Sequence, residues 1–436
     1  MTAPKLLQFG AGNIGRSFIG PLFAQAGYEV VFVDIDEALV QALNERRRYR
    51  VEVRDTPPAT LWVENVRAVH GRDTERVVAE LASADLAATA VGPAALPSLY
   101  GVIAAGLQRR RVQGRGPLDL ILCENLRHAA ALVRAGLQEH LPAGFPLDEM
   151  VGLVETSIGK MVPLMTAEQR AQDPLLVFAE AYNTLIVDRR GFRRGVPPVP
   201  GLEAKENMAA YVDRKLFIHN LGHAVAAYVG YLALPGAVYL WEAVEDPRVR
   251  AAAAAAMWES GQALIAAYPQ EFNEANQRQH IDDLLRRFAN RALGDTLYRV
   301  GRDLPRKLSP QDRLIGALRL QAQQGVDSPY TLLGTAAACL FRAGDENGEL
   351  FPADRRFAEE VYPRGLEAVL TEVCGLDARQ PVDRRLREQI AETHRFLIRQ
   401  RDAGADWLAQ YEQEHPVGMA RRKHEHPQQS ALPQGA

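Results

Sequence analysis

The stretch KLLQFGAGNIGRSFIGPLFAQAGYEVVFVD, residues 5–34, has two apolar runs on either side of a glycine motif. The runs are typical of buried parallel strands, and the segment between them has helical spacing. In the motif G-x-G-x-x-G the first glycine allows a tight turn, the second lets the backbone approach a pyrophosphate, and the third lets the helix pack on the strand. We therefore expect a dinucleotide-binding loop formed by Gly10, Ala11, Gly12, Asn13, Ile14 and Gly15.

The acidic residue at the end of the second run indicates which dinucleotide is bound. Asp34 follows the motif at the distance of about 20 residues at which a carboxylate accepts hydrogen bonds from the ribose hydroxyls of NAD. The same charge repels the 2′-phosphate of NADP. The arginines at positions 46–48 are an alternative site for that phosphate, although a run of charges usually forms a solvated face. We expect NAD as the cofactor.

Up to about residue 195, short Val-, Ile- and Leu-rich runs alternate with helical stretches. This alternation predicts an α/β domain of the Rossmann type with a mostly parallel sheet over residues 1–195. Ligands bind at the carboxyl ends of such strands. After the runs at 86–90 and 118–123 we therefore expect further cofactor contacts from Val91, Gly92, Pro93, Glu124 and Asn125.

The second half of the chain has a different pattern. The proline- and glycine-rich segment 191–207 suggests a domain boundary, and beyond it the apolar spacing is that of amphipathic helices. We predict a predominantly α-helical domain over residues 196–409. The polar, proline-bearing segment 410–436 is expected to be a disordered tail.

Composition excludes several classes of protein. A hydrophobic fraction of 47%, a charged fraction of 24% and a net charge of -3 indicate a globular protein with no general affinity for nucleic acid or anionic membrane. No apolar run is long enough for a membrane span, and the N-terminus does not resemble an export signal. The three separated cysteines suit neither a disulfide framework nor a zinc site, so we expect a cytoplasmic protein without a metal.

The segment DRKLFIHNLGHA, residues 213–224, places polar side chains in an apolar helical stretch. In a regular α-helix Lys215, Asn220 and His223 share one half of the circumference, so they can converge on one small ligand. A lysine whose pKa is depressed by burial and neighbouring cations can act as a base, and the other two side chains can donate to an oxygen. The alternative is a polar stripe that faces water.

This helix carries the K-x4-N-x2-H signature, and here the sequence resembles the polyol-specific long-chain dehydrogenases, the mannitol dehydrogenase family. The segments FGAGNIGRSFIG, TAVGP, CEN and RVGRDLPRKLSPQDRL occur in the family's order, and the likeness extends to about residue 400. It implies a zinc-independent, NAD-dependent oxidoreductase that interconverts mannitol 1-phosphate and fructose 6-phosphate by hydride transfer. It also implies that Lys215 is the acid/base and that Asn220 and His223 orient the reacting oxygen.

The same resemblance implies a set of substrate contacts. Arg299 and Lys307 match positions that contact polyol hydroxyls, Arg302 and Arg306 are candidates for the substrate phosphate, and Asp188 falls near an acidic substrate-binding position. Guanidinium groups suit phosphate oxygens through bidentate hydrogen bonds, which agrees with that assignment. A solvated basic loop is the alternative for the segment 298–308.

The segment VETSIGKMVP, residues 154–163, departs from the family pattern, because Gly159 and Lys160 stand where an Asp-Arg pair is common. Glu155 replaces an Asn or Asp near the reacting oxygen, or else it caps a helix or pairs with a cation. These departures leave open a relative that acts on free mannitol, altronate, mannonate or another polyol phosphate.

Two further alternatives belong to other classes of protein. A β-hydroxyacid dehydrogenase is disfavoured because its spacing is K-x3-N without the following histidine. A dinucleotide-binding protein without turnover is the other. We expect a monomer or a small homo-oligomer with a small-molecule substrate.

Overall fold

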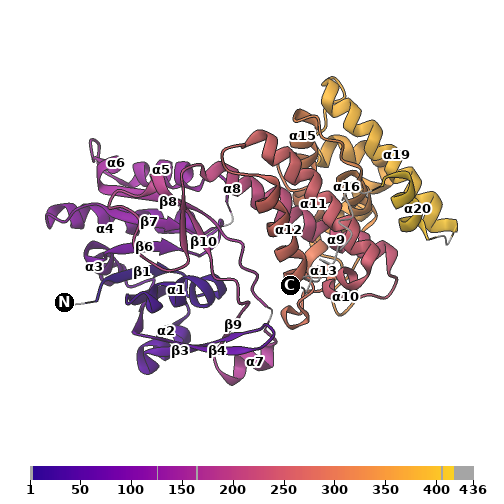
Figure 1. Cartoon of the computed structure of the whole chain (residues 1–436). Coiled ribbons are helices and arrows are strands. Elements are labelled where there is room, and N and C mark those ends of the chain that lie inside the picture. Colours follow the sequence, from indigo (N-terminus) through magenta and orange to yellow (C-terminus); the bar gives the residue numbers. More distant parts are fainter. Residues whose placement is uncertain (1–2, 125, 164, 404–405, 417–436) are drawn as a thin grey trace, which may run out of the picture.

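The computed structural model describes residues 3–124, 126–163, 165–403 and 406–416. It consists of a sheet domain followed by a helical domain, with α8 (Met208–Arg214) between the two parts (Figure 1). The predicted fold class, a Rossmann-type α/β domain followed by a mostly α-helical one, is confirmed.

The main sheet has eight strands in the order β11-β10-β8-β7-β6-β1-β2-β5. Neighbouring strands are parallel except at the β8 and β10 pair, which is antiparallel. The strands are β1 (Lys5–Phe9), β2 (Glu29–Asp34), β5 (Val66–His70), β6 (Leu86–Thr89), β7 (Leu118–Leu122), β8 (Val151–Ser157), β10 (Leu185–Asp188) and β11 (Leu202–Lys205).

Side chains alternate between the two faces of this sheet, and each face has its own core. In β2, Val30 and Phe32 pack on one face, and Val31 and Val33 pack on the other. The helices on the first face are η1 (Gly15–Ile19), α1 (Gly20–Gln25) and α2 (Glu37–Arg46). Those on the second are α3 (Thr74–Ser83), α4 (Tyr100–Val112) and α5 (Ala129–His140), and two short helices are α6 (Leu147–Met150) and α7 (Ala167–Gln172).

A second, three-stranded sheet was not predicted. It has the order β4-β3-β9 and is formed by β3 (Arg48–Val53), β4 (Ala59–Glu64) and β9 (Val177–Ala179). Its Tyr49 is buried and donates its hydroxyl to the Arg16 carbonyl oxygen at 2.8 Å, which fixes the small sheet against η1.

The sheet domain continues beyond the predicted boundary at residue 195. β11 pairs with β10 in register, Leu185 opposite Leu202, so the proline- and glycine-rich segment before it connects two strands of one sheet. Gly201 has φ +85, a left-handed conformation that favours glycine. The predicted boundary segment 191–207 therefore contains the last strand of the sheet domain, and the helical domain begins with α8 directly after it.

The helical domain has one large core around α9 (Leu221–Ala233), α11 (Pro247–Ala267) and α16 (Pro329–Leu340). Glycines let these helices approach closely. A Cβ at Gly222 would meet Met257, and one at Gly334 would meet Val225, at under 3 Å. Other helices are α10 (Leu240–Glu245), α12 (Glu274–Phe288), α13 (Leu297–Gly301), α14 (Leu304–Lys307), α15 (Ile315–Gln323), α17 (Pro352–Arg356), α18 (Leu366–Ala368) and α19 (Pro381–Ala403).

Ordered structure also extends into the segment predicted as a tail from residue 410. Helix α20 (Trp407–Glu414) buries Trp407, Leu408 and Tyr411, and the Tyr411 hydroxyl donates to the Pro329 carbonyl at 2.7 Å. Three apolar side chains on one helical face were enough for packing, although the composition around them is polar. The remainder of the predicted tail, residues 417–436, lies outside the described residues.

Candidate active site

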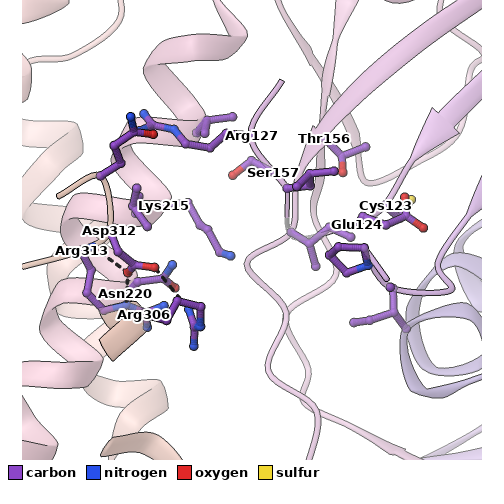
Figure 2. A pocket seen from close by; sticks show the side chains of 18 of the residues that line it. Cys123, Glu124, Arg127, Thr156, Ser157, Lys215, Asn220, Arg306, Asp312 and Arg313 are labelled. Carbon is purple, nitrogen blue, oxygen red and sulfur yellow. Dashed lines mark hydrogen bonds and ion pairs between the residues drawn. The ribbon is translucent and has the colours of Figure 1, made fainter. Parts of the chain in front are cut away.

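A cavity of about 560 Å³ lies between the two domains, a volume in the usual range for small-molecule sites. Figure 2 shows its two walls: Cys123, Glu124, Thr156 and Ser157 follow or end strands of the sheet domain. Across from them, the labelled residues of the helical domain are Lys215, Asn220, Arg306, Asp312 and Arg313.

The three glycines of the loop differ in how much space surrounds them. A Cβ at Gly10 would meet the Ala90 carbonyl oxygen at 2.5 Å, and one at Gly15 would meet the Gly10 carbonyl oxygen at 2.1 Å. A Cβ at Gly12 would meet nothing within 4 Å. The first and third glycines are therefore required for backbone packing, while the backbone at Gly12 is open to a ligand. Ile14 lines the cavity. Ala11 and Asn13 are the other residues of the loop between Gly10 and Gly15.

Asp34 lies at the end of β2, beside this loop. Its Oδ2 accepts the Ala11 amide at 2.7 Å and its Oδ1 accepts the Asp36 amide at 3.1 Å. The arginines considered as an alternative site for the NADP phosphate point to other partners. Arg46 contacts Asp173 at 2.6 Å, Arg47 contacts Glu29 at 3.7 Å and Arg48 contacts Glu64 at 4.0 Å.

Glu124 links two strand ends in the sheet-domain wall. Its carboxylate accepts the Thr89 hydroxyl at 2.7 Å and the Val91 amide at 3.1 Å, and burial raises its pKa. Glu124 thereby holds the turn after β6, which contributes Gly92 and Pro93 to the cavity wall. Asn125, which was predicted beside it, lies outside the described residues.

The helix that carries the lysine is not a regular α-helix. Between α8 and α9 the chain forms one π-helical segment, η4 (Lys215–Asn220). In a regular α-helix two residues five positions apart lie about 140° apart around the axis. In a π-helix the backbone hydrogen bonds join residues five apart, so two such residues lie nearly one above the other. The wider turn brings Lys215 and Asn220 onto the same face, and both line the cavity.

Lys215 is partly buried and surrounded by charge. Burial, with smaller effects from Arg313 and Arg306, lowers the pKa of its ammonium group to about 8, and Asp312 opposes the shift. These three neighbours form a linked group: Arg313 donates its Nε to Asp312 at 2.7 Å, and Arg306 donates to Asp312 at 3.3 Å. The arrangement places a lysine that can be neutral near physiological pH next to the Asn220 amide.

His223 is in α9, three residues after Asn220, and is not among the residues that line the cavity. Its ring stacks on Phe288, with centroids 4.7 Å apart, and its Nε2 is 3.8 Å from Asp295 Oδ2. Burial and the nearby Arg313 lower its pKa well below the usual range, so the ring is neutral. The buried Nε2 has no hydrogen-bond partner within the described part of the chain.

The four cations of the segment 298–308 differ in position. Arg306 lines the cavity and is bound to Asp303 at 2.5 Å. Arg302 is exposed and lies over the Tyr298 and Phe351 rings. Arg299 pairs with Asp295 and donates to the Val162 carbonyl at 3.4 Å. Lys307 is buried and donates to the Val300 carbonyl at 2.6 Å. The last three are outside the cavity lining, because nearby protein oxygens or rings hold them.

Two acidic residues from the sequence analysis also have partners outside the cavity. Glu155 accepts the Ala130 amide at 3.0 Å, which agrees with the interpretation that it caps a helix, here α5. Asp188 accepts the Arg190 amide at 3.0 Å at the end of β10. Neither residue is among those that line the cavity.

Sequence reasoning did not assign several residues that line the cavity. Arg127 follows β7 and pairs with Asp213, which also accepts the Tyr268 hydroxyl at 2.6 Å. Arg313 and its partner Asp312 are in the segment SPQDRL and line the cavity. Their position a few residues after Arg306 and Lys307 was a signal that could have added them to the predicted site. Lys160 was identified only as a departure from the family pattern. Its place in the cavity wall depends on the path of the chain after β8, which the sequence does not indicate.

The three thiols, Cys123, Cys339 and Cys374, are buried and free. Among the described residues no group of three or more His, Cys, Asp or Glu side chains is arranged to hold a metal ion. Across the same residues, none of the helices combines the length and the apolar character that spanning a membrane requires.

Two family models match the chain. The model described as "Mannitol dehydrogenase Rossmann domain" matches residues 4–201, and "Mannitol dehydrogenase C-terminal domain" matches residues 207–389. The mannitol-1-phosphate 5-dehydrogenase of Brevibacillus brevis is 37% identical over 388 residues, which are 88% of this chain and 96% of that protein.

Two solved structures share the fold over most of their length. Mannitol 2-dehydrogenase of Pseudomonas fluorescens, in a ternary complex with NAD and D-mannitol, has a TM-score of 0.73 at 17% identity, covering 95% of each chain. A D-sorbitol dehydrogenase in substrate-free form has a TM-score of 0.72 at 17% identity, covering 93% of this chain and 95% of the other.

Proposed function

Because the chain belongs to the mannitol dehydrogenase family, we propose that it is an NAD-dependent polyol-phosphate dehydrogenase that interconverts mannitol 1-phosphate and fructose 6-phosphate. In this proposal residues 1–205 bind the cofactor, and the helical domain from α8 onward supplies the acid/base and covers the substrate. The observation that carries the proposal is the cavity wall in which Lys215 and Asn220 face the strand ends of a dinucleotide-binding sheet.

The chain's own residues fit NAD. The backbone at Gly12 is open while Gly10 and Gly15 are tightly packed, which is the pattern of a loop that accepts a pyrophosphate. The Asp34 carboxylate beside that loop suits the adenosine ribose hydroxyls and disfavours a 2′-phosphate. The glycine loop and Asp34 would hold NAD, which would supply the hydride acceptor for oxidation of the secondary alcohol and, as NADH, the hydride donor for reduction of the ketone.

In the proposal Lys215 is the acid/base that transfers the proton. In polyol oxidation its neutral amine takes the hydroxyl proton, and in ketose reduction its ammonium group returns that proton to the carbonyl oxygen. Burial together with Arg313 and Arg306 keeps the pKa near 8, so both protonation states are accessible at physiological pH. Asn220, on the same face of η4, donates its amide to the reacting oxygen as negative charge develops there.

His223 is proposed as a neutral hydrogen-bond donor to the same oxygen. Its low pKa leaves it one N–H and no charge, and Asp295 and Phe288 restrict the ring. His223 is outside the cavity lining, so this contact stays a prediction from the resemblance to the family.

Of the residues that the structure describes, five cationic side chains line the cavity, and Glu124 and Asp312 are the lining carboxylates. The cations are Arg127, Lys160, Lys215, Arg306 and Arg313. Because carboxylates pair with the three arginines, the positive charge that remains comes from Lys160 and Lys215. That charge favours a substrate with a phosphate group over a neutral polyol. In the proposal Arg306 is a substrate contact on the helical-domain side, and Arg299, Arg302, Lys307 and Asp188 stay predictions outside the cavity wall.

The test is NADH oxidation by the purified protein with fructose 6-phosphate, fructose and other ketoses and their phosphates. We expect turnover with fructose 6-phosphate and little with fructose. Lys215→Ala should lower kcat by several orders of magnitude and leave NADH affinity unchanged. Turnover of fructose alone, or a Lys215→Ala variant with wild-type kcat, contradicts the proposal. Lys205→Ala is the matched control, because Lys205 is half-buried, pairs with Glu203 and lies outside the cavity lining.

A further inference from the structure

Lys160 lies in the cavity wall on the segment that follows β8. Its Nζ donates to the Tyr182 carbonyl at 2.7 Å and to the Asn183 side-chain oxygen at 3.4 Å, and it sits 5.0 Å from the centre of the Phe18 ring. An ammonium group has three N–H donors. Two of them therefore bind neutral oxygens of the sheet domain, and the group still forms part of the cavity wall.

The backbone on both sides of Lys160 is held by a buried ion pair that joins the two domains. Arg287 of α12 donates to Glu180, which follows β9, at 2.6 and 2.8 Å. The same guanidinium donates to the Gly159 carbonyl at 2.5 Å, and Glu180 also accepts the Met161 amide. Because Gly159 and Met161 flank Lys160, the pair fixes the residue in the cavity wall.

Lys160 differs from the arginines of the cavity in its charge balance. Arg127 pairs with Asp213, Arg306 with Asp303 and Asp312, and Arg313 with Asp312. The hydrogen-bond acceptors of Lys160 are uncharged, and Glu180 is already bound to Arg287. Burial lowers the pKa of Lys160 to about 8, as expected for an ammonium group that lacks a bound counter-ion.

We propose that Lys160 is a substrate-binding residue that recognises the phosphate group of the polyol or ketose phosphate. The inference rests on the proposed dehydrogenase function and adds a residue on the sheet-domain side of the cavity. A phosphate dianion supplies the missing counter-charge and accepts the remaining N–H in a charge-assisted hydrogen bond.

The position of Lys160 favours the phosphate of the substrate over the pyrophosphate of the dinucleotide. The cavity lining that includes Lys160 also includes Lys215 and Asn220, together with the predicted cofactor contacts Gly92, Pro93 and Glu124. Of the glycine loop, Ile14 contributes to this lining, whereas Gly10 and Gly12 do not. An effect on NADH binding is therefore a separate and measurable alternative.

The experiment compares Lys160→Gln with Lys160→Arg and with the control Lys205→Met, at a half-buried lysine outside the cavity lining. Glutamine keeps an N–H donor for the Tyr182 carbonyl but removes the charge, and Lys160→Met is the second variant if Lys160→Gln does not fold. For each protein we would measure KM and kcat for fructose 6-phosphate and fructose, the Kd of NADH, and competitive inhibition by inorganic phosphate.

We expect Lys160→Gln to raise KM for fructose 6-phosphate by about 10- to 100-fold, the range of a hydrogen bond to a charged group, and to weaken phosphate inhibition in parallel. KM for fructose and the Kd of NADH should not change, and Lys160→Arg should keep most of the wild-type behaviour. Equal losses on both ketoses, no loss at all, or a raised Kd of NADH would each overturn the assignment.

The same data separate this inference from the proposed function. A wild-type enzyme without preference for fructose 6-phosphate over fructose overturns both. A wild-type preference that survives unchanged in Lys160→Gln overturns the role of Lys160 alone.

Discussion

The charges around Lys215 make a directional prediction for the pH dependence of hydride transfer. With a pKa of about 8, roughly a tenth of the lysine is neutral at pH 7 and roughly nine tenths at pH 9. Oxidation of mannitol 1-phosphate needs the neutral amine, so its rate should rise about tenfold between these pH values. Reduction of fructose 6-phosphate needs the ammonium form, and its rate should fall by a similar factor.

The neighbouring residues allow the midpoint to be moved in both directions. Arg313 lowers the pKa of Lys215 and Asp312 raises it. Arg313→Gln should therefore move the midpoint of the oxidation profile to higher pH, and Asp312→Asn should move it to lower pH. An exposed arginine that pairs on the surface, Arg286, supplies the matched control Arg286→Gln, which should leave the midpoint in place.

The assay is the single-turnover rate of NADH formation or loss at saturating substrate, because this rate reports the chemical step in the bound complex. Lys160 also has a pKa of about 8, so each profile is measured in Lys160→Gln as well, where Lys215 is the lysine of this pair that titrates. Profiles with the same slope in both reaction directions would refute the assignment of the proton to Lys215. So would midpoints that move the same way in Arg313→Gln and Asp312→Asn.

Three more predictions concern the cofactor, the oxyanion donor and the domain interface. Asp34→Ala should reduce the preference for NAD over NADP in kcat/KM, and unchanged selectivity would show that another group reads the ribose. Asn220→Ala should lower kcat by about 100-fold with little change in KM, whereas a change confined to KM would make it a binding residue only. Arg287→Met should lower the free energy of unfolding by about 3–5 kcal/mol, because it leaves the buried Glu180 carboxylate unpaired. The double variant Glu180→Leu with Arg287→Met should recover most of that loss in urea denaturation, and additive losses would contradict the pairing.

Much of the sheet domain was predictable from local pattern. The runs around the glycine motif became β1 and β2, and the later apolar runs became β6, β7 and β8, because a strand buried on both faces needs apolar residues at nearly every position. The small sheet was missed because β3 and β9 pair across more than 120 residues, as Val51 with Val177. Such a pair leaves no signal within a short window.

The candidate site was predictable only in part. Residue types and spacing indicated Lys215 and Asn220, but the reasoning assumed a regular α-helix, whereas the π-helical segment η4 is what places them on one face. Arg299, Arg302 and Lys307 were indicated, like Arg306, by the resemblance to the family. Those three side chains interact instead with nearby carbonyls, a carboxylate and aromatic rings. The spacing of residues in the sequence does not reveal such partners.

The amino-acid sequence by itself determined the strand, glycine loop and helix order, the helical second half and the chemistry of the lysine helix, since these depend on residues within a few turns of one another. Tertiary structure alone decided which charges meet. The Arg287 and Glu180 pair, the place of Lys160 in the cavity wall and the pairing of Arg127 with Asp213 each join segments that are distant in the chain. Burial and counter-charge, which set the pKa of a side chain and its freedom to bind a ligand, exist only once those segments have packed.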